Sequence, residues 1–200
     1  MNYGQIEALF ANLHNIRTEK RIAFKARLKH LQRLGFPPGI NTGTGRAAVY
    51  GPGQIFLLGL ALEFTQMGIN PERTVKLIQD EYWAIVRSGE VAAKILLDNS
   101  LPFEPIMIFF DPAALSELME LFGDGMDTAL ATLDFGKFDS AQEAFAHWFT
   151  EGASRAAFIS VSSLLHRIQK WLALHASTAP GSYYSDFASW AEDHLRKLES

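Results

Sequence analysis

The chain contains no cysteine, which excludes disulfides, thiolate metal sites and thiol redox chemistry. It also has no long apolar run. The most apolar stretch, residues 55–62, is far shorter than the roughly 18 residues that suggest a membrane span. The first five residues, Met-Asn-Tyr-Gly-Gln, lack the charged-then-apolar layout of a signal peptide. We therefore expect a cytoplasmic protein without a membrane partner.

Signatures of catalysis and cofactor binding are also lacking. His147 and His166 do not have the spacing of a metal site, and Ser160, Ser162 and Ser163 lack the setting of a nucleophile elbow. The Gly-rich residues 39–45 lack the Gly-Lys-Ser/Thr ending of a phosphate-binding P-loop. We expect no enzyme activity and no cofactor, with a small nucleotide-using enzyme as the rival interpretation of the Gly-rich loop.

Charge is unevenly distributed along the 200 residues. The net charge is −4, which alone argues against a nucleic-acid partner. Residues 1–50, however, hold eight Lys and Arg against two Glu, a charge of +6, so the remaining residues carry −10. This asymmetry indicates a basic surface joined to an acidic body, and the acidic body would help restrict DNA contact to one side.

The most basic segment, residues 18–34, is predicted to be an amphipathic helix with Thr18 as its N-cap. We assign its apolar stripe to Ile22, Phe24, Leu28, Leu31 and Leu34. On another face, cations about 6 Å apart would follow a phosphate backbone, and these are Arg21, Lys25, Lys29 and Arg33. Gly35 and Pro37-Pro38 then end the helix.

A hairpin is predicted next, with strands over residues 36–40 and 46–50 and a Gly- and Thr-rich tip. The tip would present Asn41, Thr42, Thr44 and Arg46. Pro52 is suited to starting a helix to about Met67, which is apolar nearly all round and so must be covered on several sides. A helix over residues 70–87 follows, capped at Asn70-Pro71-Glu72.

The overall prediction is a mostly α protein with small β elements. An N-terminal winged helix-turn-helix domain (1–88) is followed by a connecting helix and linker (89–102) and an α+β dimerisation or effector domain (103–200). In the last domain we expect strands over 105–110 and 127–135, and helices over 111–122, 140–150 and 183–198. Residues 155–174 fit either a strand followed by a helix from Ser162, which we favour, or one long helix. The many aromatic residues of this domain could line an apolar effector pocket, but ordinary core packing explains them better.

Residues 24–80 resemble the DNA-binding domain of the MerR family of transcription regulators. The landmarks, in order, are Gln32-Arg33-Leu34-Gly35-Phe36-Pro37, then Tyr50, then Met67-Gly68-Ile69-Asn70-Pro71-Glu72. The resemblance implies a recognition helix, a wing and two supporting helices. It places Lys29 at a phosphate-gripping arginine of the family, His30 at a neighbouring tyrosine, and Arg33 and Arg46 at cationic backbone contacts. Where the family starts its recognition helix at Ser or Thr after a Gly turn, this chain has Ile22-Ala23-Phe24-Lys25.

These observations favour a sequence-specific, double-stranded-DNA-binding transcription regulator, acting as a homodimer and associated with the nucleoid. RNA polymerase or another transcription component is a further candidate partner. The predicted DNA contacts are Arg21, Lys25, Arg27, Lys29, His30, Arg33, Asn41, Thr42, Thr44 and Arg46. The alternative is a protein-interaction adaptor whose basic helix binds an acidic partner in the transcription machinery.

Overall fold

The structure, a computed structural model, describes residues 1–40, 47–98, 104–112, 133–150 and 155–199. In chain order its elements are α1 (Tyr3–Leu13), the 3-10 turn η1 (Thr18–Lys20), α2 (Arg21–Arg33), α3 (Pro52–Gln66), α4 (Pro71–Asp80), α5 (Tyr82–Leu97), β1 (Met107–Phe110), β2 (Leu133–Gly136), α6 (Phe138–Thr150), β3 (Ala157–Ser160), α7 (Val161–His175) and α8 (Ser182–Leu198). The prediction of a mostly helical protein with small β elements is confirmed.

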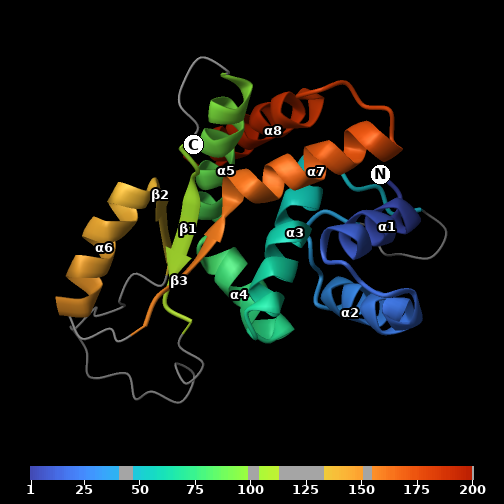
Figure 1. The fold of residues 1–200 in the computed structure, drawn as a ribbon, viewed down its shortest axis with the longest axis horizontal. Coiled ribbons are helices and arrows are strands. Elements are labelled where there is room, and N and C mark those ends of the chain that lie inside the picture. The colour runs from blue at the N-terminus through green and yellow to red at the C-terminus, as the bar shows by residue number, and fades with distance from the viewer. Residues whose placement is uncertain (41–46, 99–103, 113–132, 151–154, 200) are drawn as a thin grey trace.

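Helix α3 lies at the centre of the molecule, with other helices around it (Figure 1). Apolar residues lie on every side of this helix, and ten of its 15 residues are buried. The Phe56 ring packs 4.8 Å from that of Phe187 in α8, and the Phe64 ring packs edge-on, 4.9 Å from that of Phe110 in β1. An all-apolar helix is stable in water only when covered in this way, as the sequence predicts.

The three strands form one antiparallel sheet in the order β2-β1-β3. Alternate side chains of the central strand β1 point to opposite faces. Ile108 and Phe110 join the main core, whereas Met107 and Phe109 pack against Trp148 of α6 on the other side. Figure 1 shows α6 beyond the sheet, away from the other helices. Burial on both faces explains why the strand is a continuous apolar run.

The C-terminal predictions agree with the described residues in most places. Residues 155–174 form a strand followed by a helix, β3 then α7, and the predicted strand at 105–110 and final helix are present. Strand β2 covers the end of the predicted strand 127–135, and α6 contains the predicted helix 140–150. The predicted helix at 111–122 lies almost wholly outside the described residues.

The predicted helix boundary at Ser88-Gly89 is wrong, because α4 ends at Asp80 and α5 runs unbroken from Tyr82 to Leu97. Gly89 lies where a Cβ would come 2.7 Å from the Phe187 ring, so it permits close packing of α5 on α8 rather than ending a helix. The main core includes buried residues from both predicted domains, 1–88 and 103–200, and α5 crosses the predicted boundary between the first domain and the linker.

The predicted hairpin strands are also wrong for the residues described. Residues 36–40 and 47–50 form no strand. Pro37 and Pro38 lack the N–H that pairing requires. The backbone of Tyr50 pairs instead with the N-terminus: its amide donates to the Met1 carbonyl at 2.8 Å, and its carbonyl accepts from the Met1 amino group at 2.6 Å. The tip lies outside the described residues.

Among the described residues, no helix is both long and apolar enough to cross a membrane.

Candidate nucleic-acid interface

Helices α1 and α2 and the turn between them form the N-terminal part of the candidate interface. The Asn2 side chain accepts a hydrogen bond from the Gln5 amide at 3.0 Å, and the Gln5 side chain accepts one from the Asn2 amide at 2.9 Å, which caps α1. Asn15 adopts a left-handed conformation (φ 50°), a conformation that asparagine tolerates better than most residues. The prediction that Thr18 is the N-cap of α2 is wrong: Thr18 begins the 3-10 turn, and Lys20 is the N-cap of α2.

One side of α2 anchors the helix to the body through Phe24, Leu28 and Leu31, which are at most 5% exposed. Ile22 does not join them, and its side chain is 85% exposed. Two residues along a helix differ by about 200°, so Ile22 points almost directly away from Phe24. The assignment of Ile22 to the apolar core stripe was therefore wrong, and the helical angle alone could have shown it.

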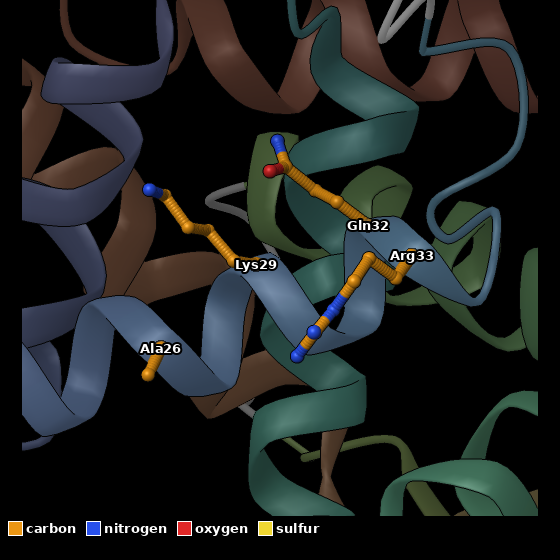
Figure 2. Close-up of a pocket in the computed structure, with 4 residues that line it drawn as sticks. All are labelled: Ala26, Lys29, Gln32 and Arg33. Atoms are coloured by element: carbon orange, nitrogen blue, oxygen red, sulfur yellow. The ribbon is translucent and has the colours of Figure 1, made fainter.

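The opposite side of α2, here called the outer face, consists of Ile22, Ala26, Lys29 and Arg33. Their spacing of four, three and four residues places them in one row along the helix. All four are exposed. Lys29 and Arg33 form no ion pair or hydrogen bond with any other described residue. Ala26, Lys29, Gln32 and Arg33 line a depression of about 480 Å³. Figure 2 shows these four side chains on α2.

The remaining cations predicted on α2 are placed differently. The Lys25 ammonium lies 3.2 Å from the Glu7 carboxylate of α1 and 5.8 Å from the centre of the Tyr3 ring. Arg21 is half-buried at the start of the helix, while Arg27 is exposed on the flank that faces α3. The predicted row Arg21–Lys25–Lys29–Arg33 therefore contains one cation already held by an acidic neighbour.

His30 contacts the start of α4. Its Nε2 lies 2.8 Å from a carboxylate oxygen of Glu72, and both side chains are solvent-accessible. The pKa of the Glu72 carboxyl is lowered by a hydrogen bond from its own backbone amide and by the hydrogen bond with His30. This pair links α2 to α4 at the edge of the interface.

A second depression of about 480 Å³ lies between α2 and the end of α3. Its floor is largely apolar, and Arg27 and His30 stand on its α2 side. The lining residues are Ala26, Arg27, His30, Leu31, Leu62, Thr65, Gly68, Ile69 and Pro71. This groove and the outer face occupy adjacent sides of the same helix.

The C-terminal end of α2 is fixed by a contact with Tyr50, which lies two residues before the start of α3. The Gln32 side-chain amide donates a hydrogen bond of 2.5 Å to the Tyr50 hydroxyl, and Tyr50 is 2% exposed. Burial raises the pKa of the Tyr50 hydroxyl, a shift that the hydrogen bond from Gln32 opposes. Asn41, Thr42, Thr44 and Arg46 lie outside the described residues.

The polar groups considered for catalysis have structural contacts. The Ser160 hydroxyl caps α7 by accepting from the Ser163 amide, and the Ser162 hydroxyl accepts from the Ile106 amide at 3.0 Å. The His166 ring lies 3.1 Å from the Tyr184 hydroxyl. Among the residues that the structure describes, no three His, Asp or Glu side chains gather as a metal site would require.

The aromatic side chains of the C-terminal half are mostly used in packing. Phe109, Phe145 and Trp148 form a cluster with ring centres 5.6–5.9 Å apart between the sheet and α6. This arrangement is that of core packing, the interpretation favoured from the sequence.

Comparison with known proteins adds no relative to this geometry: no protein family, no curated protein and no solved structure matches the chain.

Proposed function

We propose that this protein is a sequence-specific, double-stranded-DNA-binding transcription regulator that acts as a homodimer. The observation that carries the proposal is the outer face of α2. The helix is anchored on one side by buried apolar residues, while its other side presents Lys29 and Arg33 to solvent, without an ion pair to any described residue. Cations held in this way on a rigid helix are suited to phosphate contact.

The dimensions of α2 fit a DNA groove. Its 13 residues span about 20 Å, and the major groove, about 12 Å wide, admits one helix. The order of α1, the turn at residues 14–20 and α2 supports the proposal of a helix-turn-helix, in which α2 is the recognition helix. Asn41, Thr42, Thr44 and Arg46, which lie outside the described residues, remain predicted contacts to the backbone or an adjacent minor groove.

Dimerisation follows from the small footprint of one helix. A two-fold dimer doubles the phosphate and base contacts on a palindromic site. Light scattering of the purified protein over a concentration series tests this part: a mass of twice 22.3 kDa is expected, and a strict monomer that still binds palindromic DNA tightly would refute it.

Fluorescence anisotropy with a labelled duplex tests DNA binding. The probe is a pool of 40-bp duplexes with a randomised centre, titrated at several salt concentrations. We expect affinity to fall steeply as salt rises, because phosphate contacts release counterions. Affinity that does not depend on salt would contradict the proposal. Lys170→Ala, which removes an exposed cation of α7 rather than α2, is the matched control.

The second candidate, an adaptor for an acidic partner, is favoured by the groove between α2 and α3. An apolar floor flanked by Arg27 and His30 suits a short segment with apolar and acidic side chains. The two functions predict different outcomes. Loss of duplex binding in Lys29→Ala or Arg33→Ala supports the regulator. Capture of an acidic transcription component that depends on Arg27, without DNA binding, supports the adaptor.

A further inference from the structure

Ile22 is a large apolar residue where a basic surface helix would ordinarily carry a polar one. At 85% it has the highest exposure of the large apolar side chains in the part of the chain that the structure describes. It lies in the first turn of α2, and Ala26 lies one turn further along the same face. Together the two side chains form a small apolar patch at the N-terminal half of the outer face.

Cations lie on both sides of this patch along the helix axis. Arg17 and Lys20 are exposed before α2 begins, and Lys29 and Arg33 are exposed beyond Ala26. Lys29 and Arg33 lie on the same face as the patch and are about 6 Å apart along the axis. They can contact phosphates at the edge of the major groove while the patch faces into it.

Glu19 is the one acidic residue in the sequence from 17 to 33. A helix seated through its cationic ends therefore meets little repulsion from phosphates. In that position the patch of Ile22 and Ala26 faces the base edges in the floor of the groove. The first turns of a recognition helix are the part that contacts bases in helix-turn-helix proteins.

We propose that Ile22 and Ala26 select thymine in the target DNA by packing against its C5-methyl group in the major groove. Thymine is the standard base that presents an apolar group there, whereas the other bases present hydrogen-bond donors and acceptors. An isoleucine placed against a polar base edge would remove water from it without replacing the hydrogen bonds. This inference rests on the proposed DNA-binding function and adds a base preference to it.

The test uses two randomised duplex pools that differ only in the C5-methyl group of thymine. One pool is synthesised with thymidine and the other with deoxyuridine, which lacks the C5-methyl group. Sites are selected from the thymidine pool, then remade with uracil at single positions. We expect at least one position per recognition helix where removing the methyl group weakens binding about three- to fivefold, the effect of one methyl-sized apolar contact.

Variants assign the effect to the patch. In Ile22→Ala the difference between thymine and uracil should shrink at that position, while the salt dependence stays as in the wild type. Ile22 is almost fully exposed, so the substitution should leave the fold intact. Leu174→Ala, which removes a 71% exposed leucine from α7, is the matched control and should keep the full difference.

The outcomes separate the two claims. Salt-dependent binding with equal affinity for thymine and uracil at every position would overturn the thymine preference and leave the DNA-binding proposal standing. A thymine preference that persists in Ile22→Ala would overturn the assignment to this patch. Absence of duplex binding in both pools would overturn both claims.

Discussion

The side chain of Gln32 in α2 donates a hydrogen bond to the hydroxyl of Tyr50, 18 residues away, across the segment that includes the predicted wing tip. Tyr50 is buried in the core, and its backbone is paired with Met1. The last turn of α2 is thus connected to the body by this polar contact, in addition to the His30–Glu72 pair and its apolar anchors.

Tyr50→Phe should lower the free energy of unfolding by about 1 kcal/mol, since it removes this hydrogen bond without changing the packed ring. Urea unfolding of the variant and the wild type measures the difference. The control is Tyr82→Phe, whose hydroxyl has no hydrogen-bond partner among the described residues. Equal losses in the two variants would show that the Gln32 contact does not stabilise α2.

Gly53→Ala should destabilise the protein by about 1–3 kcal/mol, because a side chain is forced into a filled space. A Cβ at this position would lie 2.1 Å from the Trp190 ring of α8, which no packing tolerates. Thermal or urea unfolding measures the loss. Combining the change with Trp190→Ala should cost less than the sum of the two single effects. Strictly additive losses of stability in the double variant would contradict this account, because they would show that positions 53 and 190 do not interact.

Glu90 is expected to contribute more than a surface ion pair. Its carboxylate is 3% exposed, and it accepts hydrogen bonds from Arg87 and, at 2.7 Å, from Lys94. Glu90→Ala should cost about 1–3 kcal/mol, with the loss limited because both cations are half-exposed and Lys94 keeps its ion pair with Glu192. Asp80→Ala breaks the exposed pair with Lys76 and should cost only about 0.5 kcal/mol. Similar losses of stability in Glu90→Ala and Asp80→Ala would contradict this expectation.

Stability is expected to depend on the protonation of His14. Burial lowers the pKa of this imidazole, and its Nε2 is buried without a hydrogen-bond partner in the part of the chain that the structure describes. Below the usual histidine pKa of about 6.5, the unfolded chain therefore binds a proton more readily than the folded protein, and stability falls as pH decreases from there. Urea unfolding at pH 7.5, 6.5 and 5.5 should show this loss.

His14→Gln tests the source of that pH dependence, because glutamine does not titrate. The variant should lose less stability than the wild type between pH 6.5 and pH 5.5. Parallel losses in the two proteins would assign the effect to other groups.

The sequence predicted correctly those helices and strands in which the spacing of apolar residues reflects which faces are buried. The apolar run of β1 identified a strand buried on both sides, and the apolar residues nearly all round α3 identified a helix that is covered on several sides. The prediction failed where a residue type is compatible with two different structural roles. Gly89 is required by the Phe187 ring rather than by a helix end, and Tyr50 pairs with the N-terminus rather than within a hairpin.

The candidate site was predictable to a similar degree. Periodicity identified α2 and its cations, but the partners of Lys25 and His30 come from other helices, Glu7 of α1 and Glu72 of α4. Such contacts depend on tertiary packing and are not visible in local spacing. The exposure of Ile22 follows from its helical angle, about 200° from Phe24, and not from its residue type.

The salt dependence of DNA binding by variants of the outer face tests the central claim most directly. The logarithm of affinity for the 40-bp duplex pool is measured against the logarithm of salt concentration for the wild type, Lys29→Ala, Arg33→Ala and Lys170→Ala. The account predicts that each of the first two variants binds more weakly, with a slope flatter by about 0.9 per lost phosphate contact, and that Lys170→Ala matches the wild type. Slopes and affinities that are the same in all four proteins would contradict it.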